Sequence, residues 1–165
     1  MSPTSPGTPA EGSPGLAVLD IDGTLSDTRH RLHHLRGRRR DWGAFFAAAG
    51  QDPLHPEGLA VATELAGRGH PIVYLSGRPE RLARVTTTWL ADNGFPPGEL
   101  QLRPHGDRRP ATTVKLESLR RLAERGPIVL LLDDDPNVVE VARASGLVAE
   151  VLLASWQPDD IGHWS

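Results

Sequence analysis

Two aspartates, Asp20 and Asp22, stand one residue apart directly after the short apolar run 16–19. The run predicts a buried strand, and Gly23 and Thr24 predict a turn that places a hydroxyl beside the acids. Two carboxylates this close repel each other, so they need a cation or a shared proton. In phosphate ester chemistry, an ionised Asp20 resting on Mg²⁺ could attack phosphorus while Asp22 passes a proton to the leaving alcohol. An acidic turn after a strand explains the pair equally well on its own.

A second apolar run, residues 71–75, ends in Ser76, Gly77 and Arg78. A hydroxyl, a flexible backbone and a guanidinium at the end of a strand all suit phosphate oxygens. The competing interpretation is an ordinary turn from a strand into a helix, with Ser76 as its cap and Arg78 in solvent. The segment is therefore a candidate phosphate-binding site, called the phosphate cradle below. Only agreement with other motifs can favour this interpretation over an ordinary turn.

Lys115 is the only lysine in a chain that carries 17 arginines. A compact ammonium can neutralise a nucleophilic carboxylate and a phosphoryl oxygen together, although a general drift toward arginine would also leave few lysines. Further along, the apolar run 128–132 ends in three acids, Asp133, Asp134 and Asp135. Adjacent carboxylates after a buried strand are costly without a cation, and their hard oxygens suit Mg²⁺.

These four segments occur in the order typical of the haloacid dehalogenase-like phosphatases, which the chain resembles from Leu16 to Leu153. The resemblance implies an α/β fold, a Rossmann-like three-layer sandwich around a mostly parallel five-stranded sheet. It implies Asp20 as the nucleophile that forms an aspartyl-phosphate, and Asp22 as general acid and then base. The other implied roles are phosphate binding by Ser76, Lys115, Thr24, Gly77 and Arg78, support from Asp133, and Mg²⁺ binding by Asp20, Asp134 and the backbone carbonyl of Asp22.

The two neighbouring acids must differ in protonation for this chemistry. A metal and the ammonium of Lys115 would keep Asp20 ionised. We expect a less cationic environment around Asp22, which would let it be protonated when it donates.

Composition limits the class of protein. A length of 165 residues suits one domain, which we place at residues 15–165 because residues 1–14 are rich in Pro, Ser, Gly and Thr and predict a disordered tail. The tail lacks the apolar stretch of a signal peptide, and the run 128–132 is too short to span a bilayer, so we expect a cytoplasmic protein with no membrane contact. The absence of cysteine excludes disulfides and thiolate zinc sites. A net charge of −3 argues against a globally basic nucleic-acid binder.

Strand and helix patterns alternate, which predicts a parallel sheet with ligands at the carboxyl ends of its strands. The expected strands are 16–19, 71–78, 99–102, 127–133 and 148–153, and the expected helices are 57–68, 79–93, 113–125 and 136–145. These elements leave no room for a large cap domain, and an open site can accept the end of a polymer. The tryptophans at 42, 89, 156 and 164 could pack in the core or serve as base-stacking platforms, and the small number of aromatic residues in the chain favours packing.

Within that superfamily the chain is similar to the phosphatase domain of phage-type polynucleotide kinase/3′-phosphatases. The similarity rests on Arg31, on the string 102–110 that leads to Lys115, and on the string 133–140. In those enzymes, the matching arginines line a groove for a nucleic-acid end; here they are Arg31, Arg78, Arg103 and Arg109. The glycine pattern of a P-loop does not precede the lysine, so a kinase or ligase activity would belong to a separate partner.

The basic segment 29–40 holds six arginines and three histidines. It could contact phosphates next to a terminal 3′-phosphate, or it could be a solvated helix and loop. The sequence as a whole predicts an Mg²⁺-dependent phosphomonoesterase that removes 3′-phosphates from DNA or RNA ends. One alternative is a small-molecule phosphatase such as a nucleotidase, which would need segment 29–40 folded over the site as a small lid. The other is a catalytically idle binding module, which two opposed carboxylates make a poor fit. The oligomeric state is left open.

Overall fold

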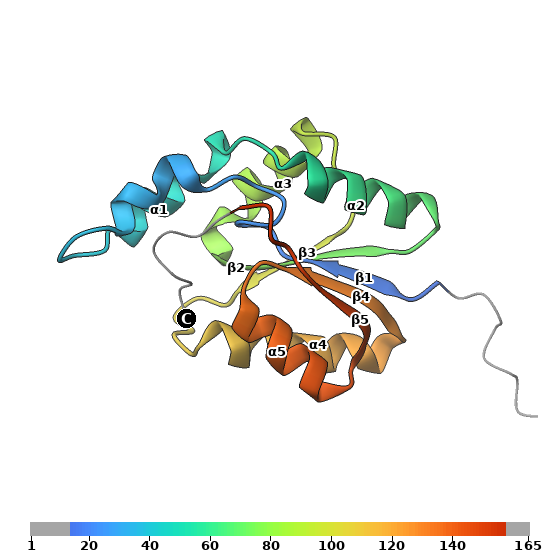
Figure 1. Cartoon of the computed structure of the whole chain (residues 1–165). Coiled ribbons are helices and arrows are strands. Elements are labelled where there is room, and N and C mark those ends of the chain that lie inside the picture. Colours follow the sequence, from blue (N-terminus) through green and yellow to red (C-terminus); the bar gives the residue numbers. More distant parts are fainter. Residues whose placement is uncertain (1–13, 158–165) are drawn as a thin grey trace, which may run out of the picture.

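The computed structural model describes residues 14–157, whose strands form one sheet in the order β3-β2-β1-β4-β5 (Figure 1). All four neighbouring strand pairs are parallel. The strands are β1 (Leu16–Leu19), β2 (Ile72–Pro79), β3 (Glu99–Arg103), β4 (Ile128–Asp133) and β5 (Val148–Leu153). The predicted five-stranded α/β sheet is confirmed. The predicted tail, apart from Pro14, and Trp164 lie outside the described residues.

Helices cover both faces of the sheet, with α2 (Pro56–Gly67) and α3 (Ala83–Asp92) on one side and α4 (Ala111–Arg125) and α5 (Pro136–Ser145) on the other (Figure 1). Alternate side chains of β1 enter the two resulting cores. Ala17 and Leu19 pack with residues of α2 and α3, whereas Val18 packs with residues of α4 and α5. A sheet buried on both faces explains why the strand sequences are continuously apolar.

One predicted helix begins later than its sequence suggested. Pro79 was expected to start a helix, because proline is favoured in the first turn. In the structure β2 continues to Pro79, which pairs with Arg103 of β3, and the short 3-10 helix η3 (Glu80–Leu82) precedes α3. Pairing with the neighbouring strand outweighs the local preference at this position.

Between β1 and α2 the chain makes a helical excursion of residues 29–51, which we call the helical insert. It consists of η1 (Arg29–Leu35), α1 (Trp42–Ala47) and η2 (Ala49–Gln51). Leu32, Leu35 and Phe45 form a small apolar cluster of its own. Figure 1 shows α1 on the side of the sheet that carries α2 and α3, well out from the strands. Within residues 14–157, no helix combines the length and the apolar character needed to cross a bilayer.

Candidate active site

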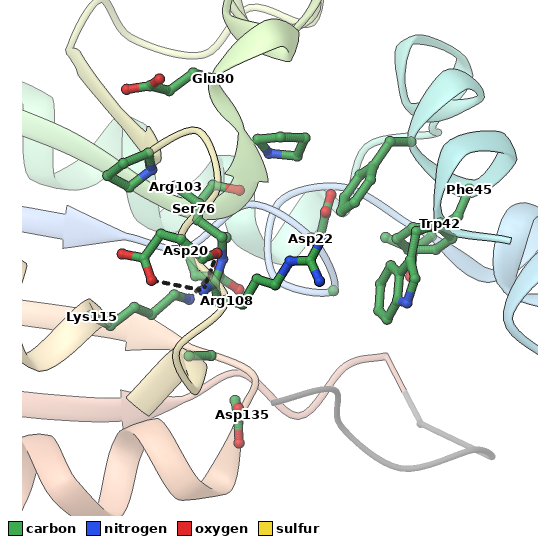
Figure 2. Close-up of a pocket in the computed structure, with 18 of the residues that line it drawn as sticks. Asp20, Asp22, Trp42, Phe45, Ser76, Glu80, Arg103, Arg108, Lys115 and Asp135 are labelled. Carbon is green, nitrogen blue, oxygen red and sulfur yellow. Dashed lines mark hydrogen bonds and ion pairs between the residues drawn. The ribbon is translucent and has the colours of Figure 1, made fainter. Parts of the chain in front are cut away.

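The carboxyl ends of β1, β2 and β4 meet at one edge of the sheet, and each brings a polar side chain there. Asp20 follows β1, Ser76 lies in β2 and Asp133 ends β4. β1 lies between β2 and β4, so the strand order reverses at this point, which is where ligands bind in open parallel sheets. All three residues line a pocket of about 1220 Å³, shown in Figure 2.

Lys115 of α4 joins two of the acids in the pocket. Its Nζ donates to Asp20 Oδ1 at 2.8 Å and to Asp133 Oδ2 at 2.6 Å (Figure 2). Burial alone would lower the pKa of Lys115, but the charges of Asp133 and Asp20 outweigh it and raise the pKa above its usual range. The lysine therefore stays charged. Asp20 Oδ2 accepts a further hydrogen bond of 2.9 Å from the hydroxyl of Thr24, which fixes the carboxylate plane.

The three acids that follow β4 have separate contacts. Asp133 is buried, and its Oδ1 accepts a 2.9 Å hydrogen bond from the backbone N–H of Asp135. Burial, and then the nearby charge of Asp20, raises the pKa of Asp133 to about 7 despite its bond to Lys115. Asp135 caps α5 by accepting from the N–H of Asn137 at 2.9 Å. Asp134 is half-buried, and all three acids line the pocket.

Carboxylate oxygens of Asp20, Asp133 and Asp134 all lie within 4.8 Å of one another, close enough to share one cation. Gly23 makes this approach possible. A Cβ at Gly23 would lie 2.2 Å from Asp134 Oδ2, and the backbone there has φ +80°, a conformation that favours glycine. Hard oxygen donors in this number fit Mg²⁺. The side-chain cluster contains Asp133, whereas the prediction drew on Asp20, Asp134 and the backbone carbonyl of Asp22.

Asp22 has a more cationic environment than the sequence suggested. Its Oδ1 accepts hydrogen bonds from Arg31 Nη2 at 2.8 Å, from Arg78 Nη2 at 2.7 Å and from the hydroxyl of Ser26 at 3.1 Å. Burial would raise the pKa of Asp22, but the charges of Arg78 and Arg31 outweigh it and hold the pKa well below its usual range. The expectation of a less cationic environment was wrong, because Arg31 and Arg78 turn inward and donate to Asp22.

Arg31 and Arg78 do not line that groove. Both side chains are fully buried. Arg78 Nη1 donates to the hydroxyl of Thr86 at 3.0 Å, and the guanidinium of Arg31 lies over the ring of Phe45, 4.2 Å from its centroid. Their contacts with Asp22 therefore hold that residue in place from inside the fold. The prediction that the two arginines face a nucleic-acid strand is corrected.

Sequence reasoning missed Asp52, which balances the two buried arginines. Its carboxylate accepts from Arg31 Nε and Nη2, both at 2.7 Å, and from Arg78 Nη2 at 3.3 Å. His30 Nε2 lies 2.6 Å from Asp52 Oδ1. Two arginines and two aspartates thus form one buried network. In sequence, Asp52 stands before a proline in a stretch that resembles an ordinary turn, so no local pattern marks it.

Ser76 and Gly77 lie where the phosphate cradle was predicted. Both line the pocket, and Ser76 is buried. The Ser76 oxygen accepts from the N–H of Arg78 at 3.1 Å, so its hydroxyl proton can be donated to a ligand. Gly77 has open space where a Cβ would stand, which leaves its backbone accessible to a bound group.

A loop between β3 and α4 forms the opposite rim of the pocket. Arg103 donates to the backbone oxygens of Asp107 and Arg109 at 3.3 and 2.7 Å, and Arg109 pairs with Asp107 and Glu117 at 2.8 and 2.7 Å. Hydrogen bonds from Arg109 lower the pKa of Asp107 to about 2. Arg103 and Arg109 line the pocket as predicted. Arg108, which was not singled out, is exposed, lines the pocket and extends into it in Figure 2.

The helical insert supplies the remaining wall. Trp42 packs against Phe45 and Phe46, and it is also 37% exposed and lines the pocket. Trp89, in contrast, is buried and donates to the backbone oxygen of Asp52 at 2.8 Å. The basic residues 36–40 are exposed and do not line the pocket. The pocket-lining members of this region are Thr28, Leu32, Trp42, Phe45 and Phe46.

With this geometry established, a family comparison identifies the chain. The model for the polynucleotide kinase PNKP phosphatase domain matches residues 14–152. The chain belongs to this family. Its members are haloacid dehalogenase-like phosphatases, hydrolases that act on phosphate monoesters, in agreement with the resemblance drawn from the motifs. Among curated proteins, no sequence matches this chain.

Solved structures share the fold. A chain in the structure of a Pnkp1/Rnl/Hen1 complex is 24% identical with a TM-score of 0.73, and the alignment covers 88% of this chain and 47% of that chain. A second structure, of the Pnkp1/Rnl/Hen1 RNA repair complex, gives the same identity and TM-score and covers 44% of that chain. The class C acid phosphatase of Bacillus anthracis is 16% identical with a TM-score of 0.69, covering 92% of this chain and 69% of that chain. The present chain thus spans a little under half of the chains it matches in the repair complexes.

Proposed function

We propose that this phosphatase domain removes 3′-phosphates from the ends of DNA or RNA through a covalent aspartyl-phosphate on Asp20. The observation that carries the proposal is the position of Asp20. Its carboxylate is held by Lys115 at 2.8 Å and by Thr24 at 2.9 Å at the base of a wide pocket, and Asp22 stands two residues further along the chain. Such an arrangement supports nucleophilic attack by one carboxylate and proton transfer by the other.

The reaction would proceed in two steps. In the first, an oxygen of Asp20 forms a bond to phosphorus, the ester bond to the 3′-oxygen breaks, and a proton from Asp22 passes to that oxygen. Because Arg78 and Arg31 hold the pKa of Asp22 low, this step would proceed only in the fraction of the protein in which Asp22 carries a proton. In the second, water attacks phosphorus, Asp22 takes the water proton, and the bond to Asp20 breaks to release phosphate. Lys115 and the Ser76 hydroxyl would bind phosphoryl oxygens during both steps.

Mg²⁺ fits the acidic cluster of Asp20, Asp133 and Asp134. When bound, the ion would neutralise charge on the phosphoryl group. Asp133 also holds Lys115 at 2.6 Å, so this residue orients the ammonium as well as contributing to the cluster. Gly23 keeps the approach to Asp134 free of a side chain.

Nucleic-acid ends are supported as the substrate by family membership and by the open pocket with Arg108 extending into it. The repair complexes that share this fold contain further components, as their name Pnkp1/Rnl/Hen1 states. We propose by analogy that a separate kinase or ligase acts on the same ends as this domain.

A small-molecule phosphatase such as a nucleotidase is the second candidate. One observation favours it: Leu32, which belongs to the segment 29–40 that would form the lid, lines the pocket together with Trp42 of α1.

One substrate comparison separates the two candidates. Turnover is measured for an oligonucleotide with a 3′-phosphate, for its 5′-phosphorylated counterpart and for free nucleotides, each with and without Mg²⁺. We expect the 3′-phosphorylated oligonucleotide to react fastest and only with Mg²⁺. Preference for free nucleotides would favour the second candidate.

The covalent step is tested separately with Asp20→Asn and labelled substrate. This variant should neither turn over nor accumulate phosphoenzyme, whereas the matched control Asp92→Asn, an exposed residue at the end of α3, should do both as the wild type does. Hydrolysis retained by Asp20→Asn would refute the aspartyl-phosphate.

A further inference from the structure

The aromatic wall of the pocket is concentrated in one short helix. The whole chain contains four tryptophans and three phenylalanines, and α1 alone places one tryptophan and two phenylalanines on the pocket. We name Trp42, Phe45 and Phe46 the aromatic wall. A single exposed apolar residue on a surface needs no explanation, but aromatic side chains gathered beside a reactive centre do.

The ring contacts within the wall hold the indole of Trp42 in place. Trp42 is stacked on Phe46, with centroids 5.8 Å apart and planes at 26°, and it meets Phe45 edge-on at 5.7 Å. Phe45 is only 5% exposed, whereas Trp42 keeps 37% of its surface accessible. Figure 2 shows Trp42 and Phe45 together on the side of the pocket beyond Asp22. The wall therefore places part of the Trp42 indole at the pocket in a fixed orientation.

The wall is joined directly to the reactive end of the pocket by Arg31. Its guanidinium lies over the Phe45 ring at 4.2 Å and donates to Asp22 Oδ1 at 2.8 Å. The guanidinium of Arg31 thus lies between Phe45 and Asp22, the residue proposed to protonate the leaving oxygen. In a nucleotide, the base is separated from the 3′-phosphate by one sugar ring. Asp20 and the aromatic wall line the same pocket, so a terminal nucleotide with its phosphate at Asp20 has its base in the space that the wall borders.

Cationic groups lie beside the same space. Arg108 extends into the pocket from the β3–α4 loop, and the Cζ of Arg81 lies 5.9 Å from the Phe46 centroid. The end of the pocket that holds Lys115 and Ser76, the aromatic side and the cationic groups match the phosphate, base and backbone of a terminal nucleotide. A substrate without an aromatic group would leave the indole surface unused.

We propose that the aromatic wall is a nucleobase subsite, on which the base of the 3′-terminal nucleotide stacks against Trp42. The inference rests on the proposed function and deepens it by assigning where the terminal base binds. Stacking on an aromatic side chain is tolerant of sequence, because every base has a π-face. The subsite therefore recognises the presence of a base and not its identity.

The test uses two oligonucleotide 3′-phosphates that differ only at the terminal nucleotide, which is either normal or abasic. Stacking of one base on an aromatic side chain changes affinity by about fivefold or more. For the wild type, we expect KM to be at least about fivefold higher for the abasic substrate. Trp42→Leu keeps an apolar side chain but removes the π-face, so it should erase this difference. Trp42→Phe should restore most of it.

Leu153→Ala provides the control, because Leu153 is 42% exposed on β5 and does not line the pocket. This variant should keep the wild-type difference between the two substrates. Equal KM values for the two substrates in the wild type would overturn the subsite. So would an equal rise for both substrates in Trp42→Leu, because a purely structural role would affect both alike. If the wild type hydrolyses neither oligonucleotide, the proposed function itself fails, which is a distinct outcome.

Discussion

Arg31 and Asp52 form a two-point ion pair between fully buried side chains, with Nε–Oδ1 and Nη2–Oδ2 distances of 2.7 Å each. Neither residue lines the pocket. The pair is nevertheless linked to the site, because the same Nη2 of Arg31 donates a hydrogen bond to Asp22. Asp52 thus holds Arg31 in place, and Arg31 in turn holds Asp22.

Replacing Asp52 should destabilise the fold. Asp52→Asn would leave two buried arginines with Asp22 as the one remaining negative charge of the network. Removing one partner of a buried ion pair costs about 3–5 kcal/mol of unfolding free energy. Urea unfolding of this variant, beside the exposed control Asp92→Asn, measures the loss. Equal stability of the two variants would show that Asp52 contributes no charge compensation.

If Asp22 acts as an acid and base, the effect of replacing it should depend on the leaving group of the substrate. Asp22→Asn should lose a factor on the order of 10² to 10⁴ in kcat on an oligonucleotide 3′-phosphate. An aryl phosphate whose leaving group needs no proton should recover part of that loss. Steady-state rates with the two substrates decide the point. If the loss is the same for both, Asp22 serves to hold Arg31 and Arg78 and does not transfer a proton.

Acid should destabilise the protein partly through Asp22. Because Arg78 and Arg31 hold the folded-state pKa of Asp22 below its usual range, its ionised form stabilises the fold above the unfolded pKa of about 4. That contribution is lost as pH falls through this value toward the folded pKa. The Tm of the wild type should therefore drop more steeply between about pH 5 and pH 2 than the Tm of Asp22→Asn. Parallel pH profiles would contradict this account.

Alanine substitutions at two glycines with positive φ can distinguish the effect of backbone strain from an effect on metal binding. Gly23 and Gly37 have φ +80° and +96°, but only a Cβ at Gly23 would strike Asp134; at Gly37 nothing lies within 4 Å. Both alanine variants should lose about 1–2 kcal/mol of unfolding free energy from backbone strain. Gly23→Ala alone should also weaken Mg²⁺ binding, seen as a smaller rise of Tm with added Mg²⁺. An unchanged Mg²⁺ response in Gly23→Ala would remove Asp134 from the cation site.

Neighbouring arginines on the pocket rim should differ in their effect on substrate binding. Arg109 is paired with Asp107 and Glu117, whereas Arg108 extends into the pocket. Arg108→Ala should raise KM for an oligonucleotide and reduce the slope of log KM against log salt by about one, as expected for one lost phosphate contact. Arg109→Ala should change the slope less. The same slope in both variants would place the phosphate contact elsewhere.

The groups at strand ends were predictable from sequence for a simple reason. Parallel strands meet at their carboxyl ends, so acids and a serine placed directly after apolar runs must converge. Asp20, Ser76 and Asp133 do so. Lys115 comes from a helix and contacts Asp20 across 95 positions of sequence, and the order of the family motifs located it where strand patterns could not.

The orientation of long side chains could not be predicted. An arginine near a nucleic-acid motif is expected to face the substrate, yet Arg31 and Arg78 turn inward because Asp22 and Asp52 offer buried carboxylates. Asp52 carries no local pattern of its own. Trp42 was expected to pack, and its additional place on the pocket follows from how the helical insert folds, which no local pattern indicates.

The position of β1 has a consequence for how the protein is made. β1 is the first strand of the described chain and the central strand of the sheet, so it leaves the ribosome well before β2 and long before β4. One edge of β1 lacks a partner until β2 has emerged, and the other edge lacks one until β4 has emerged. Unpaired edges expose a nascent chain to wrong pairing. The ammonium and the acids that complete the Asp20 centre come from α4 and β4. Reactive chemistry can therefore begin only once nearly the whole domain has been synthesised and the centre of its sheet has closed.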